Sequence, residues 1–168
     1  MKNYFKNIFA LTILLSLTNA FASSLTEDAR NREINETCST YLSQIEDSYG
    51  LNGLNITFAH PKSPSIFPSL HISSKKYDNG TSSFSATLTP DGDNCYLSTV
   101  MITAVNNQSC SEIEMIKIDS DENLKVNSYA DGDFTILTPS DNTFQIVLTT
   151  LGESGCTITE TRMLWPGK

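Results

Sequence analysis

The chain has 168 residues, with 11 lysines and arginines against 19 aspartates and glutamates, and a formal net charge of −8 at pH 7. Such an acidic chain is repelled by phosphate backbones and anionic lipid surfaces, which argues against nucleic acid or a charged membrane surface as a partner. Its length suits one domain, since a fold of about 150 residues hides roughly 70% of the surface that the unfolded chain exposes.

Residues 1–22 predict an export signal. Two lysines precede an apolar run over residues 8–17, and residues 20–22 (Ala-Phe-Ala) supply the small-x-small pattern of a signal peptidase site. The run is too short to span a membrane, and no cysteine follows it closely enough for a lipid anchor. We expect a mature chain of residues 23–168, periplasmic or secreted and without stable membrane insertion. Loss of the two lysines changes its net charge from −8 to −10.

The first element predicted in the mature chain is a helix over residues 24–50. Ser24 and Glu27 have the spacing of a capping box, and Gly50 suits the C-cap position. Apolar residues recur between them at three- and four-residue steps. These residues are Ile34, Cys38, Tyr41, Leu42, Ile45 and Tyr49. The pattern therefore places Cys38 on the packed face of the helix.

Three strand-like segments follow the helix, and the same order then repeats. The first set covers residues 69–74, 82–89 and 95–104, with turn-type residues between them. The second set covers residues 133–138, 143–150 and 156–165. Specific residues correspond: Phe84, Ala86, Leu88, Cys95 and Leu97 match Phe144, Ile146, Leu148, Cys156 and Ile158. We predict two pseudo-repeats, at about 24–105 and 106–168, each of one helix plus three strands.

Residues 110–119 are the ambiguous segment of this pattern. Correspondence with the first repeat predicts a helix, with Ser111 and Glu114 as a second capping box. On the local pattern alone, the alternation of Ile116 and Ile118 favours a strand of a continuous meander equally well.

All four cysteines lie in the mature chain, and an even number in an exported protein predicts two disulfides. No two cysteines lie two to four residues apart and both histidines lie far from them in sequence, so we expect no metal site. The repeat favours the pairs Cys38 with Cys95 and Cys110 with Cys156. The rival pairing, Cys95 with Cys110, stays open because sequence does not fix connectivity.

Apolar residues alternate with hydroxyl or amide residues in both sets of strands, which predicts an antiparallel sheet with one wet face. Helices would cover the other face, in a single disulfide-bonded α+β domain. The layout of tandem helix-plus-sheet units, each with its own disulfide, resembles that of the β-lactamase inhibitory proteins. The resemblance implies an exported scaffold that binds another protein.

Motifs of catalysis are missing from the sequence. It has no Gly-x-Ser-x-Gly elbow, no His-Glu-x-x-His and no phosphate-binding glycine loop, so we expect a protein that is not an enzyme and needs no cofactor. Residues 119–123 (DSDEN) begin like a calcium loop, but Leu124 and Ala130 stand where that loop needs glycine and glutamate. The Asp-Gly-Asp tripeptides at 91–93 and 131–133 fit ordinary turns.

A proline-rich segment, residues 60–70, is the predicted binding site. The first repeat is longer than the second by about eleven residues, and this segment is the natural place for them. Three prolines restrict its backbone, which lowers the ordering cost of binding. The candidate contact residues are His60, Lys62, Ile66 and Phe67. The alternative is that Ile66 and Phe67 fold back to cover a sheet edge.

These observations predict an inhibitor or immunity-type protein that binds an envelope enzyme or toxin through the proline-rich segment and the hydroxyl-rich sheet face. A first alternative is an accessory module of an envelope assembly, with Met163 and Trp165 as an oligomer contact. A second, less favoured one is a small secreted hydrolase that uses carboxylates.

Overall fold

The computed structural model describes residues 23–129 and 133–164. The predicted export signal, Trp165 and part of the second Asp-Gly-Asp tripeptide lie outside these ranges. The first half comprises α1 (Leu25–Asn31), α2 (Glu36–Tyr49), β1 (Leu54–Phe58), β2 (Ser69–Tyr77), β3 (Gly80–Asp91) and β4 (Asn94–Val105). The second half comprises α3 (Cys110–Ser120), β5 (Leu124–Tyr129), β6 (Phe134–Pro139), β7 (Phe144–Leu151) and β8 (Gly155–Leu164).

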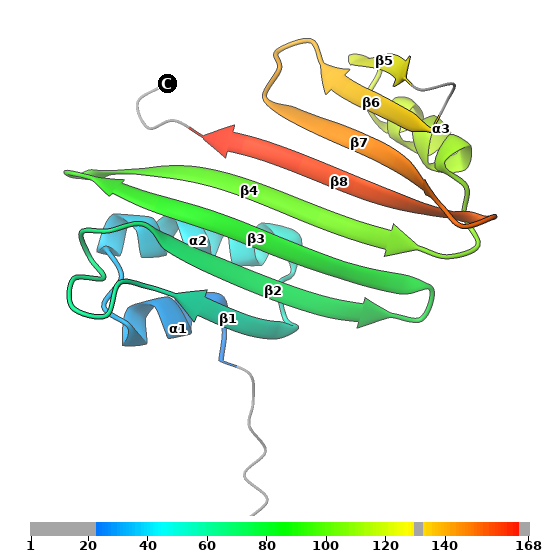
Figure 1. The fold of residues 1–168 in the computed structure, drawn as a ribbon. Helices are drawn as coiled ribbons and strands as arrows, with labels where there is room; N and C mark the ends of the chain where they lie inside the picture. The colour runs from blue at the N-terminus through cyan, green and yellow to red at the C-terminus, as the bar shows by residue number, and fades with distance from the viewer. Residues whose placement is uncertain (1–22, 130–132, 165–168) are drawn as a thin grey trace, which may run out of the picture.

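The eight strands form one antiparallel sheet in the order β1-β2-β3-β4-β8-β7-β6-β5 (Figure 1). The two halves meet where β4 pairs with β8, the last strand of each half. Val100 lies opposite Thr161 in this pairing, at the same sequence offset that relates Cys95 to Cys156. An approximate two-fold axis therefore passes through the pair of Val100 and Thr161 and relates the halves.

All three helices cover the same face of the sheet, as the alternation predicted. Cys95 and Val105 share one face of β4 because an even number of positions separates them, and Val105 pairs with Cys156 on β8. The disulfides attach α2 to Cys95 and α3 to Cys156, so both helices lie on that face. We call it the covered face and the opposite one the open face.

The helix predicted over residues 24–50 is two helices, which corrects that expectation. Its ends are as predicted: the Ser24 hydroxyl accepts the Glu27 N–H at 3.0 Å, and Gly50 is a left-handed C-cap with φ 58°. The break comes where Asn35 Oδ1 accepts the Cys38 N–H at 3.2 Å and starts α2. Ile34 is buried within the break, so the apolar period continues across it and hides it in the sequence.

The ambiguous segment is a helix, α3, but its capping box is not the predicted one. The box joins Ser109 and Glu112 rather than Ser111 and Glu114. The Ser109 hydroxyl accepts the Glu112 N–H at 3.3 Å, and the Glu112 carboxylate accepts the Ser109 N–H at 2.8 Å. The helix thus begins at Cys110 itself.

Each half has four strands rather than the predicted three. The two strands that sequence analysis missed are β1 and β5. These are the two edge strands of the sheet, and each pairs with one neighbour only. Both are short, at five and six residues. Alternation of apolar and polar side chains along β1 and over residues 124–127 of β5 is the signal that could have revealed them.

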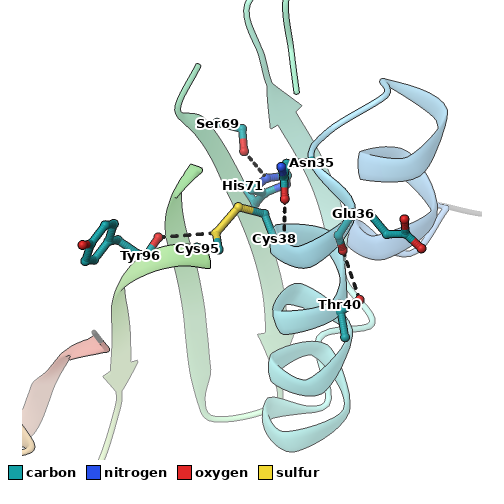
Figure 2. The surroundings of a disulfide bond; sticks show 8 residues. All are labelled: Asn35, Glu36, Cys38, Thr40, Ser69, His71, Cys95 and Tyr96. Carbon is teal, nitrogen blue, oxygen red and sulfur yellow. Dashed lines mark hydrogen bonds between the residues drawn. A yellow bond between two sulfur atoms is a disulfide. The ribbon is translucent and has the colours of Figure 1, made fainter. Parts of the chain in front are cut away.

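The disulfides pair as the repeat predicted, Cys38 with Cys95 and Cys110 with Cys156, and the rival pairing of Cys95 with Cys110 is wrong. The Cα atoms lie 5.3 Å apart in the first bridge, which fastens α2 to β4 (Figure 2), and 5.0 Å apart in the second. Neither bridge crosses between the halves. Most of the apolar core lies in the first half, where α1 and α2 pack on β3 and β4.

Candidate functional site

The predicted site residues lie together on the loop that joins β1 to β2, residues 59–68 (Figure 1). The loop lies beside the C-terminal end of α1. His60 and Lys62 stand at its start, and Ile66 and Phe67 follow near its end.

The His60 side chain organises the backbone of this loop. Its Nδ1 atom accepts the N–H of Lys62 at 3.3 Å and the N–H of Ser63 at 3.1 Å. Its ring packs against Phe67, with ring centroids 4.5 Å apart. The Ser63 carbonyl in turn accepts the N–H groups of Ile66 and Phe67, both at 3.3 Å. The loop is therefore two successive turns held together by one imidazole.

The apolar pair of this loop faces solvent. Ile66 is 69% exposed and Phe67 47% exposed. The alternative in which the pair folds back over a sheet edge does not fit these exposures. Two large apolar side chains on a braced backbone are instead available to a partner.

The loop holds fewer of the additional residues than the sequence predicted, which is a second correction. The strand registers place His71 at the position of Leu137 and Thr57 at that of Val126. By this alignment about three additional residues lie in the β1–β2 loop and about six in the β2–β3 hairpin, which extends further than its counterpart. The asymmetry of the halves is thus shared between loop and hairpin.

A shallow cleft of about 300 Å³ separates the loop from the end of α1. Arg32, Glu33, His60 and Lys62 contribute polar groups to its walls. The Arg32 guanidinium is held by Asp28, with Nε 3.2 Å from each carboxylate oxygen. The apolar tip of the loop therefore has a flank that contains both positive and negative charges.

The open face of the sheet is only partly the hydroxyl-rich surface that the sequence predicted. Hydroxyl side chains line this face at Ser83, Ser85 and Thr87 on β3 and at Thr157, Thr159 and Thr161 on β8. The strand between them, β4, presents Val100 and Ile102 to the same face. Toward the β1 edge the face becomes apolar, at Leu54, Ile56, Phe58, Leu70 and Ile72. Sequence analysis missed this apolar region because it missed β1.

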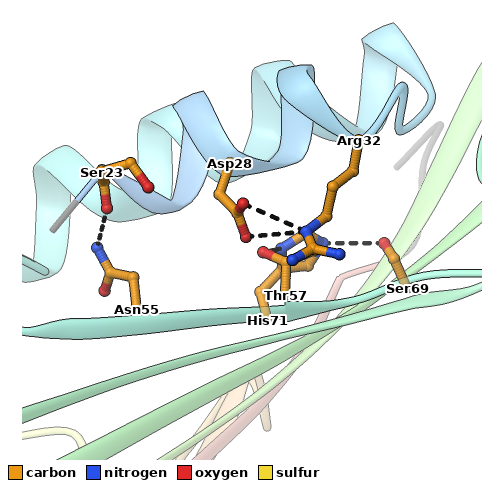
Figure 3. Close-up of polar contacts among 7 residues, drawn as sticks. All are labelled: Ser23, Asp28, Arg32, Asn55, Thr57, Ser69 and His71. Atoms are coloured by element: carbon orange, nitrogen blue, oxygen red, sulfur yellow. Dashed lines mark hydrogen bonds and ion pairs between the residues drawn. The ribbon is translucent and has the colours of Figure 1, made fainter.

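His71 is the centre of a buried polar cluster that sequence analysis did not anticipate (Figure 3). Its Nδ1 atom lies 3.1 Å from the Thr57 hydroxyl and its Nε2 atom 2.9 Å from the Ser69 hydroxyl. Burial lowers the pKa of His71 to about 4, while the nearby charges of Asp28 and Arg32 act in opposite directions. The imidazole is therefore neutral at pH 7.

Ser69 and His71 resemble a serine nucleophile hydrogen-bonded to its general base, but a substrate has no access to them. His71 is fully buried, Ser69 is 3% exposed, and the third group is a threonine hydroxyl rather than a carboxylate. A substrate cannot reach the serine in this arrangement. The cluster serves as a satisfied polar element of the core.

No family model, curated protein or solved structure matches the chain. The likeness to the β-lactamase inhibitory proteins thus remains one of layout, and the site is argued from its own geometry. Within residues 23–129 and 133–164, no cluster of three or more His, Cys, Asp or Glu side chains is placed to hold a metal ion. No helix in the same ranges has the length and apolar character to cross a bilayer.

Proposed function

We propose that this chain is an exported, non-catalytic binding protein that inhibits or neutralises an envelope enzyme or toxin, with the β1–β2 loop as its recognition element. One observation carries the proposal: Ile66 and Phe67 are exposed on a loop whose backbone is fixed by His60.

Such a loop suits inhibition because its backbone is already held in one conformation before a partner binds. Fixing a flexible segment costs free energy that binding must offset, and a backbone already held by hydrogen bonds and three prolines avoids much of that cost. Ile66 and Phe67 are then free to enter an apolar pocket of the target as anchors.

The charge of the chain indicates the kind of target. With a net charge of −10 over residues 23–168, the protein associates fastest with a neutral or basic surface. Lys62 and Arg32 beside the loop tip offer donors to acidic or carbonyl groups at the rim of such a pocket.

The test is capture of a partner from an envelope extract, followed by its affinity for two charge-matched variants. The loop variant is the double substitution Ile66→Asp and Phe67→Asp. The control is Ser140→Asp with Ser154→Asp, two exposed turn residues of the second half. We expect the loop variant to weaken binding at least about 100-fold and the control to leave it unchanged, because only the loop variant buries charge in the interface.

A partner that binds the loop variant as tightly as the wild type would contradict the site assignment. A parallel assay against envelope polymers addresses the hydrolase alternative, since that alternative predicts turnover without a tight partner.

The accessory-module alternative rests on a different surface. Met163 is 53% exposed on the open face, next to Tyr96, which is 40% exposed. If these residues formed the contact, a Met163→Asp substitution would abolish association and the loop variant would retain it.

A further inference from the structure

The edge strand β1 is short, but its sequence lacks the charged residues and prolines that often protect a sheet edge. Its sequence, Leu-Asn-Ile-Thr-Phe over residues 54–58, contains no charge and no proline. It pairs with β2 alone, and its outer side has no backbone partner within the described ranges. Exposed edges are normally blunted by lysine, proline or a bulge, because free N–H and C=O groups recruit other strands. The opposite edge strand, β5, carries Lys125.

An apolar patch accompanies this edge on the open face. Leu54 is 64% exposed, Ile56 41% and Phe58 56%. On β2, Leu70 lies opposite Phe58 and Ile72 opposite Ile56, which widens the patch to two strands. None of these five side chains is charged. Contiguous apolar surface of this kind marks an interaction site.

We propose that two copies of this chain associate by antiparallel pairing of their β1 strands, with Ile56 of each copy at the two-fold axis. In that pairing Leu54 of one copy lies opposite Phe58 of the other, and the two Ile56 side chains face each other. Asn55 lies opposite Thr57 on the covered face. Every apolar residue thus meets an apolar residue, and every polar residue a polar one.

The residue pattern of β1 is complementary to a second β1 strand, and this is the reason to favour a second copy of the chain over another partner. The pattern of β1 is symmetric about Ile56 in length and polarity, so the strand is its own complementary partner in the antiparallel sense. An anionic lipid surface is disfavoured by the net charge of −10 over residues 23–168. Close approach of two acidic chains is tolerated at β1 because the strand itself carries no charge.

The chain already contains a joint of this geometry. At the centre of the sheet, β4 and β8 join the two halves edge to edge around a two-fold axis, with the helices of both halves on one face. Pairing of two β1 strands repeats that arrangement at the outer edge. A joint of only five residues per strand is small compared with the roughly 1,200–2,000 Å² that stable interfaces bury, so the dimer should depend on concentration.

The test measures the mass of purified residues 23–168 by light scattering and sedimentation over a concentration series. We expect twice the mass of one chain at high concentration. Ile56→Lys should raise the dimer dissociation constant at least about 100-fold, because it places two like charges together in the joint. The control, Asn127→Lys, adds the same charge on the open face of β5 at the other edge and should leave the dimer intact.

A cross-linking variant keeps the proposal testable if Ile56→Lys fails to fold. All four native cysteines are in disulfides, so a single added cysteine is the only free thiol. Ile56→Cys should give a covalent dimer on oxidation, because residue 56 of each copy lies opposite the other. Asn127→Cys should not. A wild-type chain that stays monomeric at about 100 μM would overturn the proposal, as would equal cross-linking of both variants. Since no other protein is present, the outcome is independent of the capture experiment.

Discussion

His71 and Leu137 occupy the same position in the two halves of the sheet, and both are fully buried. His71 lies opposite Ala86 on β3, whereas Leu137 lies opposite Ile146 on β7. The small alanine leaves room for the imidazole, and the isoleucine fills the corresponding space beside the leucine. One half therefore holds a hydrogen-bonded polar cluster at a position that is apolar in the other.

Stability below neutral pH should depend on this histidine. Burial lowers the pKa of folded His71 to about 4, while an unfolded histidine titrates near 6.5. Between these pH values the unfolded chain binds the additional proton, so the free energy of unfolding falls as pH drops from 6.5 to 4, by about 3 kcal/mol.

The matched variant transfers the residues of the second half, Thr57→Val with His71→Leu, after Val126 and Leu137. Urea unfolding at pH 7 and pH 4 should show that the variant loses about 3 kcal/mol less than the wild type over this interval. His60→Gln, at an exposed histidine, should retain the wild-type dependence. An equal loss in wild type and double variant would place the acid sensitivity elsewhere.

The cap of α3 should be sensitive at Ser109 and insensitive at Ser111. Ser109→Ala removes the hydroxyl that accepts the Glu112 N–H and should lower the free energy of unfolding by about 1 kcal/mol. Ser111→Ala, at the start of the rejected capping box, should change it by less than about 0.5 kcal/mol. The N–H and hydroxyl of Ser109 also lower the pKa of Glu112, so Ser109→Ala should raise that pKa in an NMR titration. Equal effects of the two alanine substitutions would argue against this cap.

The two disulfides should differ in their local effect. Replacing either pair by alanine should destabilise the chain by about 4 kcal/mol in the chain-entropy estimate, since the bridges span 57 and 46 positions. However, α2 also buries Leu42 and Ile45, whereas Ile113 is the one fully packed residue of α3. Hydrogen exchange should therefore show α3 losing protection when its bridge is removed, and α2 retaining it when the other bridge is removed.

The two turns of the β1–β2 loop should depend on the Nδ1 atom of His60, which accepts two backbone hydrogen bonds. His60→Phe retains a ring against Phe67 but removes the acceptor for the N–H groups of Lys62 and Ser63. Exchange of these two amide protons should accelerate roughly tenfold in NMR measurements. Ile66→Ala, which keeps the acceptor, should leave their exchange unchanged. Unaltered exchange in His60→Phe would show that the turns form without the imidazole.

Much of the fold could be predicted because it repeats. Correspondence between Cys95 and Cys156 and between the strands before them led to the correct disulfide pairs and the helical state of α3. Alternation along the strands led to the face that the helices cover. The break before α2 was missed because Ile34 maintains the apolar period while the backbone leaves the helix. Periodicity reports which side is buried and not whether the helix continues.

The polar cluster and the apolar patch could not be predicted for a shared reason. Both need β1, whose five residues form a strand only by pairing with β2 across the loop. Thr57 reaches His71 only in that register, and Ile56 joins Ile72 only on the face that the register selects. The hydrogen bonds that His60 accepts from the loop backbone could not be predicted either, because they produce no periodic pattern in the sequence.

Because each bridge closes within its own half, residues 106–109 are the sole covalent connection between the two. A protease cut in this connection would leave two fragments, each with its own internal disulfide, that stay associated through the pairing of β4 with β8. The cleaved protein would elute as one particle in native buffer and separate into two in denaturant without any reducing agent.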